Sequence, residues 1–277
     1  MKGKQKMIKE AIILLGGMGT RLLPYTKVVS KEMLPIYDNP MIYYLVKELY
    51  ESGIKRIIFV VNDKNESLIK NYFSKDIILE NNLDSNKKTL LNDLNKLIDN
   101  IEFIYVKQKI KGTYGALYSA KDYINNDNFI VYYGDDYLPS YNSTKDLIES
   151  YYKTGKMQVL IKEEKILPNV GIVKIDKDNY LENLVKKDDI HSNAILLGRM
   201  LLNKKIFNVK DELMIHNNDE LYLSYALLKF KKEVLTNKYR GDYFNIGEKM
   251  GFIKANIYYI MNSERCNELK EYLDSFK

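Results

Sequence analysis

The chain has 277 residues, 45% of them hydrophobic and 29% charged, and a formal net charge of +6. This composition fits one or two globular domains and argues against a disordered or collagen-like chain. A single cysteine and two histidines exclude an intrachain disulfide and disfavour a Cys- or His-rich metal site. No apolar run approaches the ~20 residues of a membrane span, and no segment resembles a signal peptide. We therefore expect a cytoplasmic protein with no membrane partner.

The basic charge comes mostly from lysine, because arginine occurs at only five positions. Asn, Ile and Tyr are also heavily used, and all four residue types have AT-rich codons, so the composition indicates drift in an AT-rich genome. Lysine and acidic residues are interspersed throughout, whereas a nucleic-acid binder typically gathers its cations on one face. We therefore expect no nucleic-acid partner.

Strands and helices alternate in the first half of the chain. Apolar, β-rich runs predict strands at 11–15, 56–61, 103–106 and 129–133. Helical spacing of apolar residues predicts helices at 41–50, 66–73 and 116–124. The long, polar, Leu-spaced segment 76–100 predicts a helical insertion and not a loop. The alternation predicts an α/β fold with a Rossmann-like, mostly parallel central sheet flanked by helices.

The pattern changes after about residue 150. Four further strands are predicted with little helix between them, at 157–162, 171–175, 181–186 and 194–202. Helices are predicted at 220–230 and, as one or two terminal helices, at 252–273. No Pro- or Gly-rich linker separates the halves. We expect a single domain over 1–277, with a nucleotide-binding half (about 1–150) and an appended β-rich half with C-terminal helices (about 151–277).

A Gly-rich segment, Leu15-Gly16-Gly17-Met18-Gly19-Thr20-Arg21, directly follows the first strand. Glycines let backbone N–H groups approach an anion closely. The segment is neither a Walker loop, which needs Gly-Lys-Ser/Thr, nor a dinucleotide fingerprint, whose third glycine is replaced. The glycines alone are equally consistent with a simple turn. The cations that follow, Arg21, Lys27 and Lys31, favour a triphosphate site, although Lys27 and Lys31 could instead be solvated surface.

A second feature is Gly134-Asp135-Asp136, directly after the strand at 129–133. Ligands of open α/β sheets bind outside the carboxyl ends of the strands, so this turn should lie near the Gly-rich segment. A carboxylate beside phosphates is most simply a magnesium ligand. An Asp-containing turn at the end of a strand is common, so Asp135 and Asp136 indicate a metal site only in combination with the Gly-rich segment.

The ordered set of motifs resembles the sugar-1-phosphate nucleotidyltransferase (nucleotide-sugar pyrophosphorylase) family. The resemblance begins with Gly-Gly-x-Gly-Thr-Arg and Ser30-Lys31-Glu32-Met33-Leu34-Pro35-Ile36, and it covers nearly the whole chain. Further matching stretches are 37–44, Gln108, 112–116, 134–136, 169–172, 192–193, 198–199 and 247–252.

The resemblance implies a role for each matching residue. The nucleotide-binding loop would be Gly16, Gly17, Gly19 and Thr20, and the base would be read by Gln108 and Gly112. The catalytic residues would be Arg21 and Lys31 on the nucleotide phosphates, Asp135 on Mg²⁺, and Lys187 on the sugar phosphate. Sugar contacts would come from Gly171, Lys186, Lys187 and Glu220, and the metal site from Asp135 and the position of Asn245.

Two branches of the family compete. Residues 41–44 and the Gly16-Gly17 doublet resemble glucose-1-phosphate thymidylyltransferases. The inserted segment 76–100, Gly198-Arg199 and especially 247–252 resemble bacterial UTP–glucose-1-phosphate uridylyltransferases, and a whole inserted element outweighs a few shared residues. The resemblance thus implies uridylyl transfer from UTP to glucose 1-phosphate, with Mg²⁺ as cofactor and a homodimer or homotetramer as the assembly.

The chain departs from the family pattern at three positions. Lys186 replaces the Glu of Glu-Lys-Pro, which normally contacts sugar hydroxyls, and Asn245 replaces a metal-contacting Asp. Tyr225 replaces an acidic residue. Loss of a charge at Asn245 should weaken metal binding. Three interpretations therefore remain: a uridylyltransferase with a compensated site, an enzyme for another nucleotide or sugar phosphate, or an impaired paralogue that binds nucleotide.

Overall fold

The computed structural model describes residues 7–139, 143–164, 171–185, 194–213 and 219–276. Nine of the described strands form one central sheet, in the order β10-β9-β11-β6-β1-β4-β5, with β8 beside β11 and β12 beside β8. These strands are β1 (Glu10–Leu14), β4 (Arg56–Val61), β5 (Glu102–Lys107), β6 (Asn128–Tyr133), β8 (Met157–Glu163), β9 (Ile172–Ile175), β10 (Leu181–Leu184), β11 (Ala194–Asn203) and β12 (Val234–Lys238).

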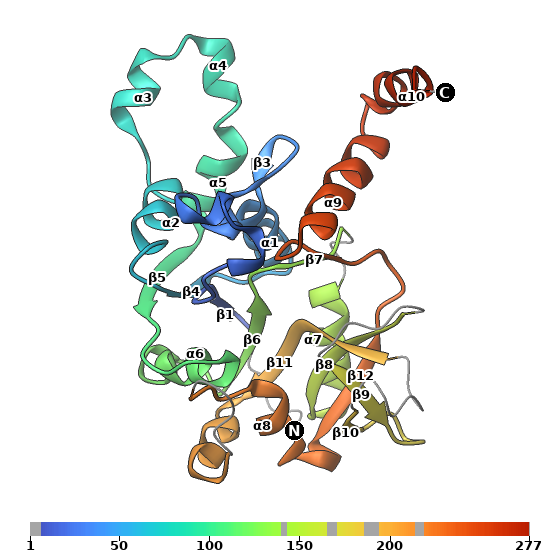
Figure 1. The fold of residues 1–277 in the computed structure, drawn as a ribbon. Coiled ribbons are helices and arrows are strands. Elements are labelled where there is room, and N and C mark those ends of the chain that lie inside the picture. The colour runs from blue at the N-terminus through green and yellow to red at the C-terminus, as the bar shows by residue number, and fades with distance from the viewer. Residues whose placement is uncertain (1–6, 140–142, 165–170, 186–193, 214–218, 277) are drawn as a thin grey trace.

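The first half forms the parallel part of the sheet, as predicted: β6, β1, β4 and β5 all run parallel. The β-rich half does not form a separate sheet. Its long strand β11 pairs antiparallel with β6, β8 and β9 and so joins both halves into one mixed sheet (Figure 1). The α/β fold is confirmed, whereas the division into two halves at about residue 150 stays a prediction.

Successive strand residues point to opposite faces of the sheet, and both sets are apolar. Helices therefore cover both faces. In β1, Ile13 packs in one apolar cluster with α1 and α7, and Ile12 packs in the other with α6 and α8. The helices of the first half are α1 (Met41–Glu51), α2 (Glu66–Tyr72), α3 (Ile77–Asn82), α4 (Ser85–Thr89), α5 (Asn92–Asn100) and α6 (Thr113–Ser119). Those of the second half are α7 (Ser143–Thr154), α8 (Leu223–Leu228), α9 (Lys249–Met261) and α10 (Cys266–Asp274).

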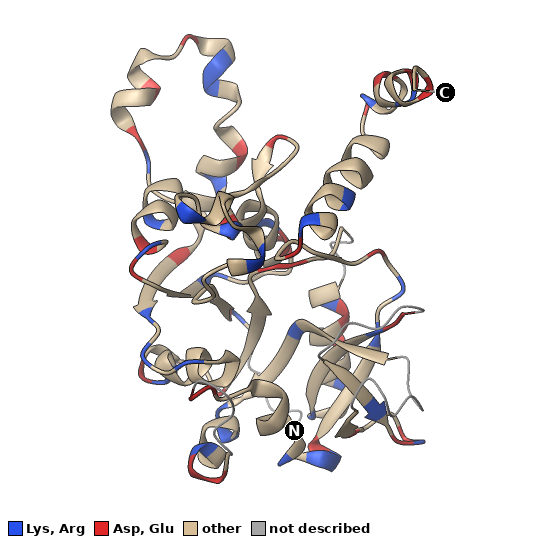
Figure 2. Ribbon diagram, in the orientation of Figure 1, with Lys and Arg blue, Asp and Glu red and all other residues tan. Residues whose placement is uncertain are grey.

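The insertion at 76–100 is helical, as predicted, and projects from the body as α3 and α4 before α5 returns to it (Figure 1). It breaks into short helices because Asp76 and Asp84 each accept a hydrogen bond from the backbone of a first turn and so start new helices. Lysine and acidic residues are interspersed over all parts of the ribbon (Figure 2). Among the described residues, no helix is long and apolar enough to cross a membrane.

Several boundaries differ from the sequence expectation. The helix expected at 220–230 is confined to α8, because Leu221 pairs through its backbone with Lys111 and Tyr114. Neither α7 nor β12 was predicted, since their polar residues hide the apolar spacing. Two short strands were also not predicted, β7 (Asp136–Tyr137) and β13 (Phe244–Asn245), which pair antiparallel. Two-residue strands have no periodicity that a sequence could show. A further two-stranded ladder joins β2 (Pro35–Ile36) to β3 (Asn39–Pro40).

Candidate active site

The Gly-rich loop leaves the carboxyl end of β1 and turns at Gly19, whose φ of 66° favours glycine. A short 3₁₀ turn, Thr20–Leu22, follows and leaves Thr20 and Arg21 exposed. Two asparagines after β4 hold the start of the loop: Asn65 Nδ2 donates to the Leu15 carbonyl (2.7 Å) and Asn62 Nδ2 to the Gly16 carbonyl (3.2 Å). Sequence reasoning missed both, although their place at the same sheet edge is a usable signal.

The residues predicted to read the base lie directly beside this loop. A Cβ atom at Gly16 would lie 1.4 Å from Gln108 Oε1, so only glycine fits there while Gln108 keeps this position. Gln108 Nε2 donates to the carbonyl of Ile110 (2.7 Å). Gly112 has a φ of 85°, and a Cβ there would lie 2.2 Å from the Leu221 carbonyl oxygen. The structure therefore brings the two predicted nucleotide-binding segments together.

Lys31 connects the Gly-rich loop to Asp135. Its Nζ lies 2.6 Å from Asp135 Oδ2, and the two side chains are only 12% and 18% exposed. The same Nζ lies 3.4 Å from the Cβ position of Gly17. Lys31 is thus not solvated surface, whereas Lys27 is exposed. Burial is the largest influence and alone would raise the pKa of Asp135. The charge and hydrogen bond of Lys31, the Arg21 charge and a backbone hydrogen bond together outweigh burial and hold that pKa below its usual range.

Asp135, Asn245 and Gly247 form a corner opposite the loop, which we call the Asp135 corner. A Cβ at Gly247 would lie 2.9 Å from both Asp135 Oδ2 and Asn245 Oδ1, and 3.6 Å from Arg21 Nη2. The two predicted metal ligands and a predicted phosphate cation are therefore neighbours. Arg21 Nη1 lies 2.7 Å from Glu248 Oε1, and this ion pair is more than half exposed.

The Asp135 corner suits a divalent cation that also takes phosphate ligands. Asn245 Oδ1 is buried and has no hydrogen-bond partner among the described residues, so it is an available oxygen beside the Asp135 carboxylate. In the part of the chain that the structure describes, no cluster of three or more His, Cys, Asp or Glu side chains could hold a metal by itself. The residues present therefore fit a cation whose remaining ligands come from the substrate.

Glu32 is a buried acid that sequence reasoning did not single out. Its side chain is fully buried, and neither carboxylate oxygen makes a hydrogen bond of normal geometry among the described residues, although the Ser30 hydroxyl and the Glu32 backbone N–H lie near enough to lower its pKa. Burial raises the pKa of Glu32 to about 7, against the lowering effect of the neighbouring Lys31 charge. Glu32 follows Ser30 and Lys31 directly, so the local sequence gives no sign that its carboxylate is buried.

The sugar side of the site is described in part. Gly171 has a φ of 82° and its carbonyl accepts a hydrogen bond from Leu196 N (2.7 Å). Glu220 Oε2 accepts a hydrogen bond from Tyr222 OH. Glu220 lies close to the Gly112 turn because the next residue, Leu221, pairs through its backbone with that turn. Lys186 and Lys187 lie outside the described residues. The roles predicted for these four residues stay predictions.

Comparison with known proteins identifies the family of the chain. The family model described as Nucleotidyl transferase matches residues 10–267. The chain belongs to the nucleotidyl transferase family. The chain is also 34% identical to UTP–glucose-1-phosphate uridylyltransferase 2 of Staphylococcus saprophyticus, over 98% of this chain and 99% of that protein.

Solved structures of the family have the same fold. A UDP-glucose pyrophosphorylase complexed with UDP-glucose is 29% identical, with a TM-score of 0.82 over 93% of this chain and all of that one. A UTP-bound UGPase from Acinetobacter baumannii is 28% identical, with a TM-score of 0.85 over 98% of this chain and all of that one. Each match spans more than nine tenths of this chain and the whole of the other chain, so this nucleotidyltransferase has the complete fold of these relatives.

Proposed function

We propose that this nucleotidyltransferase transfers uridylyl from UTP to glucose 1-phosphate, giving UDP-glucose and pyrophosphate. One observation supports the chemistry most directly: Lys31 contacts both Asp135 and the Gly-rich loop, so a phosphate-binding loop, a cation and a metal ligand converge. The relatives named for this reaction, and those solved with UTP or UDP-glucose, support the choice of substrates.

The proposed reaction needs no general base, because a phosphate oxygen of the sugar phosphate is already an anion. That oxygen attacks the α-phosphorus of UTP in line, and the bond to the bridging oxygen of the β-phosphate breaks as pyrophosphate leaves. Negative charge grows on the departing pyrophosphate, where Arg21 and Lys31 would neutralise it. Lys187 would hold the sugar phosphate for attack. Catalysis then consists of positioning and charge neutralisation.

We infer that Mg²⁺ is the cofactor and that Asp135 and Asn245 hold it. Asp135 and Asn245 would hold the ion, whose positive charge would neutralise part of the triphosphate charge. Lys31, which pairs with Asp135, would then exchange the carboxylate for a phosphate oxygen. Because Asn245 is neutral, most of the metal affinity should come from the nucleotide, and the free protein should bind Mg²⁺ weakly.

The test is release of pyrophosphate by purified protein given Mg²⁺, glucose 1-phosphate and either UTP or dTTP. We expect release with UTP to exceed release with dTTP. Equal or faster turnover with dTTP would instead favour the thymidylyltransferase branch. No release with any pairing of nucleoside triphosphate and sugar phosphate, together with measurable UTP binding, would favour an impaired paralogue.

We further infer that the protein works in the cytoplasm as a homodimer or homotetramer. Its single cysteine fits a reducing compartment, and the oligomer rests on the family resemblance alone. Light scattering on the purified protein would determine the oligomeric state, and a monomer at cellular concentrations would contradict this inference.

A further inference from the structure

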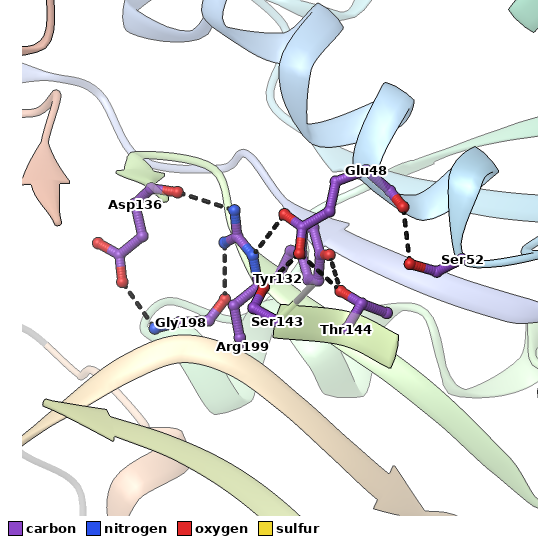
Figure 3. Close-up of polar contacts among 8 residues, drawn as sticks. All are labelled: Glu48, Ser52, Tyr132, Asp136, Ser143, Thr144, Gly198 and Arg199. Carbon is purple, nitrogen blue, oxygen red and sulfur yellow. Dashed lines mark hydrogen bonds and ion pairs between the residues drawn. The ribbon is translucent and has the colours of Figure 1, made fainter. Parts of the chain in front are cut away.

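A buried ion pair lies directly beside the Asp135 corner. Arg199 of β11 and Glu48 of α1 are 0% and 2% exposed, and Arg199 Nε lies 3.4 Å from Glu48 Oε2. The guanidinium also stacks on the ring of Tyr132, 3.7 Å from its centroid. Glu48 Oε1 accepts hydrogen bonds from the hydroxyls of Ser143 and Thr144 at the start of α7 (Figure 3).

The other two arms of the Arg199 guanidinium reach the turn after β6. Nη2 donates to the Asp136 carbonyl (3.0 Å) and Nη1 to the Gly198 carbonyl (3.1 Å). The Asp136 carboxylate in turn accepts from Gly198 N (2.6 Å) and from Tyr243 OH (3.1 Å). Asp136 is therefore held through its backbone by Arg199 and through its side chain by Gly198 (Figure 3). Tyr243 also holds the Asp136 side chain.

Asp136 is the residue through which this network reaches the Asp135 corner. It follows Asp135 directly and pairs with Asn245 in the ladder of β7 and β13. Ile246 N donates to the Asp135 carbonyl (2.8 Å). Asp135 and Asn245 thus have their backbones fixed by the same short ladder, and Arg199 joins that ladder to the central sheet.

Stability alone is a weak reason for such an ion pair. Buried charges lose hydration, and replacing a buried pair with apolar side chains is often neutral or stabilising. Arginine is also rare in this lysine-rich chain. A planar guanidinium can direct separate N–H groups to Glu48, Gly198 and Asp136 at once, which a lysine ammonium on a flexible stem cannot reproduce in the same plane.

We propose that Arg199, with Tyr243, is a positioning residue that holds Asp135 and Asn245 at the spacing needed for the metal–nucleotide complex. This inference rests on the proposed function. Arg199 acts on the Asp135 corner through Asp136, and Tyr243 acts through Asp136 and through its contact with the side chain of Asn245. Because small misplacements of reacting groups lower rates strongly, loosening this turn should reduce turnover more than it reduces folding stability.

Two variants test the proposal. Arg199→Lys keeps the charge beside Glu48 but loses the planar set of donors. Tyr243→Phe removes only the hydroxyl, which donates to Asp136 and also contacts the Asn245 side chain. We expect Arg199→Lys to lower kcat about 10-fold or more and Tyr243→Phe a few-fold. Both should raise the Mg²⁺ concentration for half-maximal activity, with little change in the KM for glucose 1-phosphate.

The matched control is Arg56→Lys. Arg56 and Glu10 form a second, largely buried ion pair (15% and 0% exposed) at the amino ends of β4 and β1, the opposite end of the strands from the site. If Arg199 serves only stability, Arg199→Lys and Arg56→Lys should change melting temperature alike and leave kcat and the Mg²⁺ curve unchanged. That result, with Tyr243→Phe also unchanged, overturns the proposal, and if Arg199→Lys does not fold, Tyr243→Phe alone decides.

A readout apart from activity separates this inference from the proposed function. Calorimetry would measure the affinity for UTP with and without Mg²⁺ in each protein. We expect Mg²⁺ to strengthen UTP binding to the native protein and to Arg56→Lys, and to do so several-fold less in Arg199→Lys and Tyr243→Phe. An inactive native protein with this binding pattern contradicts uridylyl transfer but supports the positioning role, whereas equal enhancement in all four proteins overturns the positioning role.

Discussion

The Gly-rich loop and the Asp135 corner face each other across the candidate site, but they are held in different ways. The loop consists of glycines and 3₁₀ turns, and its cation Arg21 is paired with Glu248 through an exposed contact. The corner lies in a ladder tied to buried Arg199 and Asp136. An exposed ion pair contributes at most about 1 kcal/mol, so the loop can rearrange around a triphosphate at low cost.

From this difference we expect that Arg21 and the exposed part of the loop adjust to the nucleotide, whereas the Asp135 corner is preformed. Lys31 belongs to both regions, since it extends from the segment after the loop and pairs with Asp135. Loss of the Asp135 carboxylate or of Lys31 should therefore damage catalysis most, and substitutions at Glu32 and Asn245 should change stability or metal use.

The largest effect is expected for Asp135→Asn. The change removes the only carboxylate of the Asp135 corner and leaves the Lys31 ammonium without its partner, so turnover should fall on the order of 10³-fold. Pyrophosphate release measures this. Asp63→Asn is the control, because Asp63 follows β4 at the same sheet edge and pairs with Lys107 at 2.7 Å in an exposed contact. Near-native activity of Asp135→Asn would show that the metal site lies elsewhere.

Lys31→Ala comes next and tests the residue that joins the two regions. Loss of a preorganised cation on the leaving pyrophosphate should lower kcat on the order of 10²-fold. Since Lys31 is largely buried against Asp135, the variant should also lose about 1–3 kcal/mol of unfolding free energy. The control, Lys107→Ala, removes an exposed lysine and should change neither kcat nor the free energy of unfolding. An unchanged kcat in a folded Lys31→Ala protein would exclude the phosphate role.

Glu32→Gln tests the buried acid beside Lys31 through stability. The native pKa of about 7 exceeds the ordinary value of 4.5, so between these pH values the folded state holds a proton that the unfolded chain releases. Stability of the native protein should therefore fall as pH rises from 4.5 to 7, by on the order of 2–3 kcal/mol, and then level off. Glu32→Gln should remove this part of the pH dependence. Identical unfolding profiles of the two proteins across that range would contradict it.

The sequence predicted the parts of the site that have local patterns and missed those that depend on tertiary contacts. Apolar runs ending in glycine located the loop and the Asp135 turn, because parallel strands bring their carboxyl ends to one edge. The same rule could have added Asn62 and Asn65. Nothing local shows that Lys31 is buried against a residue more than 100 positions away. The network of Arg199 with Glu48 could not be predicted from the sequence either, because it depends on the antiparallel pairing of β11 with β6.

The smallest effect is expected for Asn245→Asp, which restores the charge that the family pattern places at the Asp135 corner. The side chains are nearly isosteric, and Asn245 Oδ1 already lies unpartnered beside Asp135. Hard cations favour charged oxygen ligands, so the Mg²⁺ concentration for half-maximal activity should fall several-fold. Without metal, two carboxylates at this spacing repel, so Mg²⁺ should raise the melting temperature of the variant more than that of the native protein.

The control for Asn245→Asp is Asn86→Asp, which adds the same charge on the exposed α4 of the insertion. Asn86→Asp should leave both the Mg²⁺ curve and the melting shift at native values. If Asn245→Asp also leaves both unmoved, Asn245 does not face the metal, and Asp135 must meet it with substrate oxygens alone. If instead the Mg²⁺ requirement rises, the added charge disturbs the Lys31 pair more than it helps the cation. The Asp135 corner would then need a single carboxylate, and the neutral Asn245 side chain would preserve the ion pair between Lys31 and Asp135 that joins the corner to the Gly-rich loop.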